Sequence, residues 1–104
     1  MPHTVVFSPE AEEHLVELYR YVAQAASPET AAEFTEAIVA HCERLADFPH
    51  RGTKRDDIRP GLRITHYRKR TIIAFAVFED RVAVLGIYYG GREYETRLGG
   101  SEQA

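Results

Sequence analysis

The sequence predicts an α+β domain in which a hairpin of two helices packs on one face of an antiparallel β-sheet. Helix-type and strand-type patterns are segregated along the chain, in the order strand, helix, helix, strand, strand, strand. The run from Thr71 to Phe78 carries no charge and is rich in β-branched and aromatic residues, which is typical of a central strand buried on both faces. A chain of 104 residues is long enough for one domain with one core.

The first strand and the first helix are indicated by the residues from His3 to Ala25. His3 to Ser8 is a short apolar run with β-branched residues. Ser8 suits an N-cap, and Pro9 follows at the first helical position, where its missing N–H has no cost. An apolar stripe then repeats every three or four residues, as one face of a helix requires, at Ala11, Leu15, Leu18, Val22 and Ala25.

A second helix is predicted because Ser27-Pro28 repeats the same start signal. Pro49 stops this helix, since a proline disfavours the helical conformation of the residue before it. Only Ala26-Ser27 separates the two helices, so we expect an antiparallel hairpin whose apolar faces are covered by the sheet. Phe48 marks the end of this helix. The apolar face of the helix is formed by Ala31, Phe34, Ile38, Cys42 and Leu45.

Three further strands are predicted as a meander. They are Leu62 to Tyr67, Thr71 to Phe78 and Arg81 to Tyr89, and the last two are joined by the short polar pair Glu79-Asp80. A polar connection rich in turn residues, Phe48 to Gly61, precedes them. We expect residues 1–98 to form the single domain and residues 99–104 to be a disordered tail.

Charge is distributed unevenly, although the net charge of the chain is only −3. Residues 1–50 have a net charge of −7, and residues 51–70 hold eight basic and two acidic residues, for +6. The basic segment suggests an anionic partner. Pairing of this segment with the acidic helices of the same protein is the alternative, and the sequence leaves both open.

Several classes of function find no support in the residues. The chain has no apolar stretch of about 20 residues and no signal-peptide pattern at its start, so a cytoplasmic protein without a membrane contact is expected. The five histidines lack metal-ligand spacing, and Cys42 falls on the apolar stripe, where it suits a core position. No glycine-rich phosphate-binding motif is present, and we expect no cofactor.

A cluster of aromatic and cationic residues lies where the last predicted strand ends. It contains Arg and Tyr side chains, which can bind phosphates and stack on bases, at Tyr88, Tyr89, Arg92, Tyr94 and Arg97. A catalytic role would need a general base, and the pattern of this cluster does not assign one. The alternative is that the tyrosines pack at the edge of the sheet while the arginines are solvated.

Three segments together resemble the ParE branch of the RelE/ParE toxins. They are SPEAEEHLVELYRYV, LADFPHRG and TIIAFAVFEDRVAVLGIYYGGREYE, and the resemblance extends from about Thr4 to Leu98. The family fold, β-α-α-β-β-β, agrees with the order predicted above. The resemblance implies the toxin of a type II toxin–antitoxin pair, silenced by a ParD-like antitoxin with a ribbon-helix-helix DNA-binding domain. Operator DNA would be reached only through the antitoxin.

The resemblance also implies a target, because ParE-like toxins are associated with the poisoning of DNA gyrase. We expect an antitoxin segment to fold on the toxin, with apolar side chains between the helical hairpin and the sheet and acidic ones on the basic segment. The expected antitoxin-binding residues are Arg51, Arg55, Arg59, Arg63, Tyr19 and Tyr21. The expected residues for toxicity and target binding are Tyr88, Arg92, Tyr94 and Arg97.

Two other functions stay open for a protein with this resemblance. The RelE branch cleaves ribosome-bound mRNA with Lys, Arg and Tyr side chains, and the candidates here are Arg63, Lys69, Arg92 and Tyr94, whose pattern differs from the RelE set. A toxin fold without toxicity, acting only as a binding partner, is the other alternative.

Overall fold

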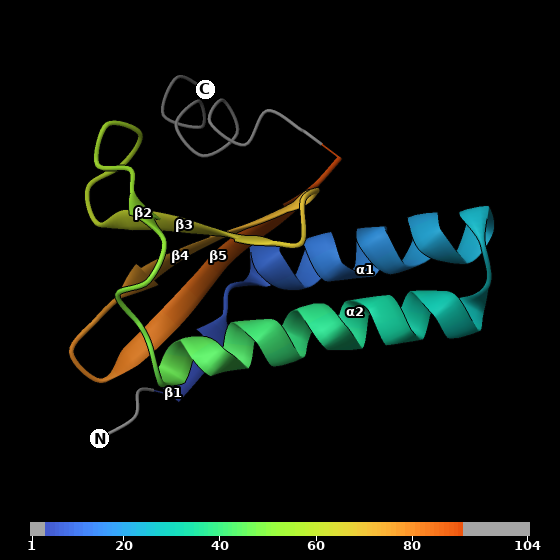
Figure 1. Ribbon diagram of the computed structural model, residues 1–104, viewed down its shortest axis with the longest axis horizontal. Helices are drawn as coiled ribbons and strands as arrows, with labels where there is room; N and C mark the ends of the chain where they lie inside the picture. The colour runs from blue at the N-terminus through green and yellow to red at the C-terminus, as the bar shows by residue number, and fades with distance from the viewer. Residues whose placement is uncertain (1–3, 91–104) are drawn as a thin grey trace.

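The computed structural model describes residues 4–90 and shows two helices packed against a mixed five-stranded sheet (Figure 1). The α+β class and the predicted succession of elements are confirmed, with one additional short strand. The elements in chain order are β1 (Thr4–Phe7), α1 (Pro9–Ala25), α2 (Pro28–Glu43), the 3₁₀ turn η1 (Arg44–Ala46), β2 (Thr53–Lys54), β3 (Leu62–Tyr67), β4 (Thr71–Val77) and β5 (Arg81–Tyr89).

Both predicted helix starts are confirmed by cap hydrogen bonds. Ser8 Oγ accepts from the N–H of Ala11 at 3.0 Å, and Ser27 Oγ accepts from the N–H of Thr30 at 3.1 Å. The end of the second helix differs from the prediction, because α2 stops at Glu43 and the chain tightens into η1 before Phe48. A 3₁₀ turn at a helix C-terminus is common and satisfies carbonyls that an α-helix would leave unpaired.

The sheet has the order β1-β5-β4-β3-β2. The meander of β3, β4 and β5 is antiparallel, as predicted, but β1 pairs with β5 in parallel, with Thr4 opposite Arg81. The expectation of a wholly antiparallel sheet was therefore wrong at this edge. Parallel pairing needs a long connection, and the chain from α1 to β4 lies between these two strands. The alternation of apolar and polar residues does not indicate strand direction, so the sequence pattern could not predict this pairing.

The additional strand β2 contains only Thr53 and Lys54, which pair with Ile64 and Arg63 of β3. Two residues inside a polar loop carry no period, so the sequence pattern could not reveal this strand. Gly52 precedes it with a φ of +82°, and a Cβ there would lie 2.2 Å from the Ile64 carbonyl oxygen. Glycine is required at this position because the two backbones approach so closely.

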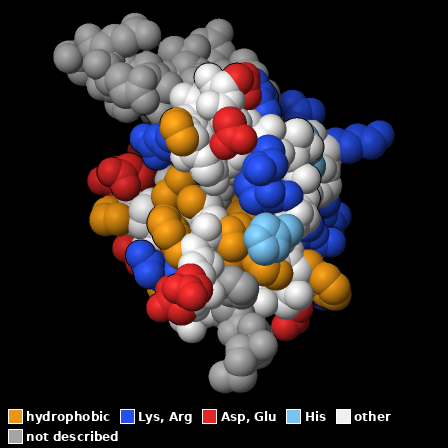
Figure 2. All heavy atoms as spheres, turned by 90° about the vertical axis from the view of Figure 1, so that its left-hand side faces the viewer, with side chains coloured by type: hydrophobic (Ala, Val, Ile, Leu, Met, Phe, Trp, Pro, Cys, Tyr) orange, Lys and Arg blue, Asp and Glu red, His pale blue; other side chains and the backbone are white. Residues whose placement is uncertain are grey.

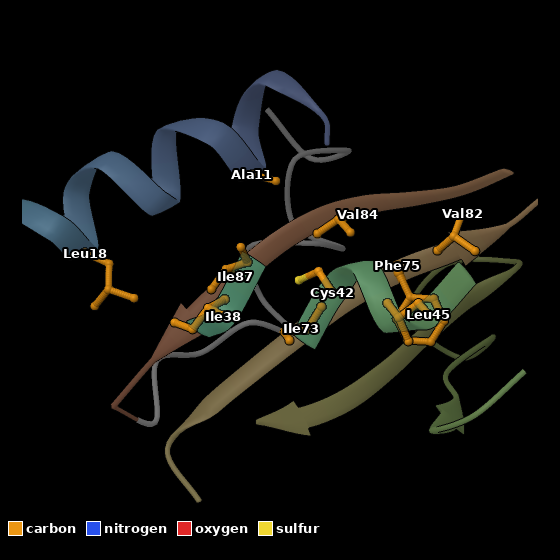
Figure 3. Close-up of a cluster of buried hydrophobic side chains, with 10 residues drawn as sticks. All are labelled: Ala11, Leu18, Ile38, Cys42, Leu45, Ile73, Phe75, Val82, Val84 and Ile87. Carbon is orange, nitrogen blue, oxygen red and sulfur yellow. The ribbon is translucent and has the colours of Figure 1, made fainter. Parts of the chain in front are cut away.

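The main core lies between the hairpin and one face of the sheet (Figure 3). Figure 3 shows side chains of β4 and β5 meeting those of α1, α2 and η1. Cys42 is completely buried among them, which confirms its predicted place in the core. The buried members are Ala11, Leu18, Ile38, Cys42, Leu45, Ile73, Phe75, Val82, Val84 and Ile87.

An irregularity in β5 decides which of its side chains enter this core. Ala74 pairs with Gly86 while Phe75 pairs with Val84, so Leu85 is an extra residue opposite the β4 ladder. This β-bulge shifts the alternation by one residue. Val84 and Ile87, three positions apart, therefore both belong to the main core, whereas Tyr88 joins Leu62, Ile64 and Ala74 in a second cluster.

The two N-caps give a matched prediction about stability. Ser8 Oγ also donates to the carbonyl of Leu85 at 3.2 Å, so it joins α1 to β5, whereas Ser27 bonds only within its own helix start. Replacing Ser27 by Ala should lower the free energy of unfolding by about 1 kcal/mol. Ser8→Ala should cost about 1 kcal/mol more, because a second hydrogen bond is lost. Urea unfolding of both variants measures the two losses of unfolding free energy, and equal losses would contradict the prediction.

Candidate functional site

An apolar groove of about 550 Å³ runs between α1 and α2. We call it the interhelical groove. Leu15, Val16 and Tyr19 line it from α1, and Val39 and Ala40 line it from α2. At 100° per residue, most of these positions point away from the side of each helix that faces the core. The charged side chains at the groove are Arg20, Glu36 and Glu43.

The space between the hairpin and the sheet, where we expected an apolar groove for the antitoxin, is filled over most of its extent by the main core, in which Phe75, Ile38 and Leu45 are fully buried. Towards the end of β5 it opens into a smaller pocket, lined from α1 and from β5. Binding of the antitoxin in this space stays a prediction. The interhelical groove includes residues beside the apolar stripes, such as Val16 and Val39. The helical period of apolar residues predicts the positions that face the core, so it did not indicate these neighbouring ones.

Basic residues gather at the start of β3, and we call them the loop cluster. The chain around them is held by hydrogen bonds to side chains. Arg63 donates from Nε to the carbonyl of Arg51 at 3.1 Å, and its other nitrogen donates to the carbonyl of His50. Asp56 accepts from the N–H of Gly61 at 2.8 Å. The loop cluster comprises Arg51, Lys54, Arg55, Arg59 and Arg63.

The charges of the loop cluster are largely left uncompensated by carboxylates. Arg55 forms a bidentate pair with Asp57 at 3.0 and 2.9 Å, and the hydrogen bond from Arg55 lowers the pKa of that carboxyl. Within residues 4–90, no ion pair joins Arg51, Arg59 or Arg63 to a carboxylate of α1 or α2. Between the two possibilities that the sequence left open, the structure thus disfavours pairing with the acidic helices.

The basic segment of residues 51–70 is not one surface. A second group, Arg68, Lys69 and Arg70, forms the turn between β3 and β4, and we call it the turn cluster. β3 contains six residues, so its two ends lie roughly 17 Å apart. Figure 1 shows the turn beside the end of β5 and the loop after β2 at the far side of the sheet. On the face drawn in Figure 2, Lys and Arg side chains gather along one side, next to hydrophobic ones.

The tyrosines expected at functional sites are distributed over three places. Tyr19 is 38% exposed and lines the interhelical groove. Tyr21, which is 60% exposed, lies on another side of α1, where its ring centroid is 6.2 Å from that of Tyr89. Tyr88 is only 4% exposed and packs beside Gly86 in the second cluster, so its side chain is not part of an exposed strand end.

Three of the residues predicted for toxicity follow β5 in the sequence. Arg92, Tyr94 and Arg97 lie outside the described residues 4–90, as does the predicted tail of residues 99–104. The assignment of these residues stays a prediction. In the sequence they come shortly after Gly90, the residue that follows β5.

Two histidines have structural roles that sequence reasoning missed. His14 Nδ1 accepts the backbone N–H of Ile87 at 3.1 Å, so α1 satisfies a donor of β5 beyond the last residue paired with β1. His41 lies 5.0 Å from the ring of Tyr67, and its Nε2 is buried without a hydrogen-bond partner. Neither role leaves a sequence signal, because each depends on a contact between residues distant in the chain.

Nucleophilic and metal chemistry find little support in the described part of the chain. Burial raises the pKa of the Cys42 thiol to about 12, which leaves the thiolate scarce at neutral pH. Among residues 4–90, no three His, Cys, Asp or Glu side chains are placed to hold a metal ion. The described helices are too short or too polar to cross a bilayer.

The protein is thus a small α+β domain with an apolar groove on its helices and two separate cationic clusters. The chain matches the family described as "ParE toxin of type II toxin-antitoxin system, parDE" over residues 5–94. Since this match spans most of its length, the protein belongs to the ParE toxin family, a branch of the RelE/ParE superfamily, and is a ParE-type toxin of a type II toxin–antitoxin system. The resemblance stated from the sequence is confirmed.

Solved structures show where the fold recurs. The chain is similar to one in "Chromosomal ParDE TA system from P. aeruginosa", with a TM-score of 0.73, 23% identity, and coverage of 84% of this chain and 95% of that one. It is also similar to a chain of the toxin–antitoxin complex RelBE2 from Mycobacterium tuberculosis, with a TM-score of 0.55, 17% identity, and coverage of 86% and 100%. No curated protein matches the sequence.

The environment of His41 predicts a dependence of stability on pH. Burial, followed by the charges of Arg51 and Arg44, lowers the pKa of His41 from 6.5. The folded protein therefore keeps this ring neutral at pH values where the unfolded chain takes up a proton. The resulting stability is present above pH 6.5 and is lost as the pH falls through the lower, folded value.

His41→Gln should reduce the loss of unfolding free energy between neutral and mildly acidic pH, because glutamine binds no proton. Urea unfolding of both proteins at the two pH values measures the difference, and the other histidines are common to both. An equal loss in the variant would show that His41 does not contribute to the pH dependence.

Proposed function

We propose that this ParE-type toxin is silenced by a ParD-like antitoxin and that its target is DNA gyrase. The antitoxin would contribute the ribbon-helix-helix domain that binds operator DNA. The observation that carries the first part is the interhelical groove, an apolar surface on helices that otherwise bear a strong negative charge. An exposed apolar surface of this kind on a soluble protein is typical of a protein-binding site.

A continuous path for such a partner leads from the groove to the loop cluster. The groove reaches Glu43 at the end of α2, and the chain then passes through η1 to Phe48. Phe48 is 66% exposed, and the guanidinium of Arg51 lies over its ring at 5.9 Å. A partner segment with apolar residues followed by acidic ones would thus meet first the groove, then Phe48, then uncompensated arginines.

Charge sets the direction of this segment. Glu36 and Glu43 lie at the α2 side of the groove and would repel an acidic helix. Acidic residues of the antitoxin are therefore expected beyond the groove, at Arg51 and Arg59. Folding of a disordered segment along this path would give a large interface and leave the free antitoxin open to proteases.

Tyr19 lies on the path, whereas Tyr21 lies on another side of α1.

The groove can be tested by placing a charge in its wall. Val16 is 47% exposed, so Val16→Asp should leave the fold intact while weakening binding of the antitoxin at least tenfold, because the carboxylate loses water on binding. Tyr21→Asp is the matched control on the same helix and should bind normally. Calorimetric titration with the co-expressed antitoxin measures both. Unchanged affinity of Val16→Asp would exclude the groove.

The loop cluster can be tested separately by charge reversal. Arg51→Glu with Arg59→Glu avoids Arg63, whose hydrogen bonds hold the loop, and should weaken antitoxin binding and reduce its dependence on salt. Lys69→Glu, in the turn cluster at the other end of β3, is the control. If the double reversal left affinity unchanged at moderate salt, the electrostatic part of the proposal would be wrong.

Gyrase as the target is supported by membership of the ParE family, and the residues after β5 are proposed to make the contact. Arg92, Tyr94 and Arg97 are of the types that dominate binding energies at interfaces. The buried ring of Tyr88 would hold the end of β5 rather than touch the target. Truncation after Gly91 should leave antitoxin binding intact and lower toxicity. Induction in cells should give DNA breaks, an SOS response and filaments for the full chain only.

A ribosome-dependent endoribonuclease is the second candidate, since the fold is shared with a chain of a RelBE complex. Two of its candidate residues, Arg63 and Lys69, lie at the two ends of β3 and so cannot meet at one phosphate. Rapid loss of protein synthesis and cut transcripts after induction, without DNA breaks, would favour this function. Normal growth would indicate a toxin fold that acts only as a partner.

A further inference from the structure

The turn cluster is not needed for the antitoxin path, and it borders a second, separate pocket. This pocket of about 280 Å³ lies where α1, the β3–β4 turn and the end of β5 meet. Figure 1 shows the three elements converging at that end of the sheet. The chemically distinctive side chains that line it are His14, Glu17, Tyr21, Arg70 and Tyr89. We propose that this pocket and the turn cluster together form a nucleotide-binding site, in which the tyrosines hold the base and the turn holds the phosphate.

The aromatic wall is suited to a flat base. Tyr21 and Tyr89 have ring centroids 6.2 Å apart at an angle of 51°, and Phe34 supports Tyr89 edge-on at 5.6 Å. Tyr21 is 60% exposed, so one of its ring faces is available to a ligand. Stacking on aromatic side chains is the usual way in which proteins bind single bases. The volume lies near the lower limit for ligand pockets, which suits one base with its phosphate outside.

The turn cluster supplies the charge for that phosphate. Arg70 lines the pocket and lies over the ring of Tyr89 at 6.0 Å, and its carbonyl accepts the N–H of Gly90 at 2.9 Å, which ties the turn to β5. Arg68 adopts a left-handed φ of +57°, rare outside glycine, and lies over Tyr67. Among the described residues, Lys69 has no carboxylate partner.

Glu17 gives the ligand an orientation and a preference. Its carboxylate lines the pocket from α1 and would repel a phosphate, so the phosphate must lie towards Lys69 and Arg70 and the base towards Glu17. A carboxylate accepts hydrogen bonds from the exocyclic amino group of a base. Adenine carries such a group and uracil does not, so an adenine nucleotide should bind more tightly than a uridine nucleotide.

This site is independent of the proposed antitoxin interface, since the two share no lining residue. The same ligand chemistry is offered by a free nucleotide and by one unit of a single strand. AMP, UMP, inorganic phosphate and a short fluorescent oligoadenylate are therefore the probes, titrated against the full chain by calorimetry and fluorescence anisotropy. Tighter binding of the oligoadenylate than of AMP would assign a strand as the ligand, and equal binding would assign a free nucleotide.

Matched variants separate the base contact from the phosphate contact. Tyr21→Ala should weaken AMP binding about tenfold or more, whereas Tyr19→Ala, on the groove side of the same helix, should not change it. Lys69→Gln with Arg70→Gln should weaken binding of both AMP and phosphate and flatten the salt dependence, and Lys54→Gln with Arg59→Gln is the control. Glu17→Gln should narrow the preference for AMP over UMP.

Three results would overturn the proposal. They are the absence of binding by AMP and oligoadenylate at millimolar concentration, phosphate binding as tight as AMP binding, and equal losses in Tyr21→Ala and Tyr19→Ala. Because Tyr21 is largely exposed, its truncation should leave the fold intact, and a normal urea-unfolding curve for the variant verifies this.

Discussion

The packing of β5 is the interaction on which the rest of the structure depends. This strand lies between β1 and β4, and it contributes Val82, Val84 and Ile87 to the main core on one face. The bulge at Leu85 is what allows Val84 and Ile87 to share that face, and it turns Tyr88 to the other. On the side of β5 away from β4, β1 pairs with its first half, and in its second half His14 accepts the backbone N–H of Ile87.

The same strand positions two of the surfaces that can bind a partner. α1 is anchored to β5 through Ser8 and His14, so its outer side is turned away from the sheet and, with α2, forms the interhelical groove. The end of β5 carries Tyr89 into the second pocket. A toxin of this size thus uses one rigid strand to hold an apolar surface and an aromatic pocket on two sides of a single helix.

The separation of charge along the chain persists in three dimensions. The acidic residues are spread over the two helices, while in the loop cluster Arg63 bonds to backbone carbonyls and Arg55 to the local Asp57. Exposed ion pairs contribute little to the free energy of folding. The absence of carboxylate partners for most arginines of the loop cluster therefore reduces the stability of the fold only slightly. Their charges stay available to an anionic partner, and the distance between the loop and turn clusters allows two different partners.

The sequence by itself determined the α+β class, both helix starts and the antiparallel meander, because caps and hydrophobic periods act over a few residues. Family membership also followed from the order of its segments. Tertiary structure alone decided the parallel pairing of β1, the strand β2, the bulge at Leu85 and the burial of Tyr88. It also divided the basic segment into two clusters and placed the groove between the helices. Each of these depends on contacts between residues far apart in the chain, which no local pattern encodes.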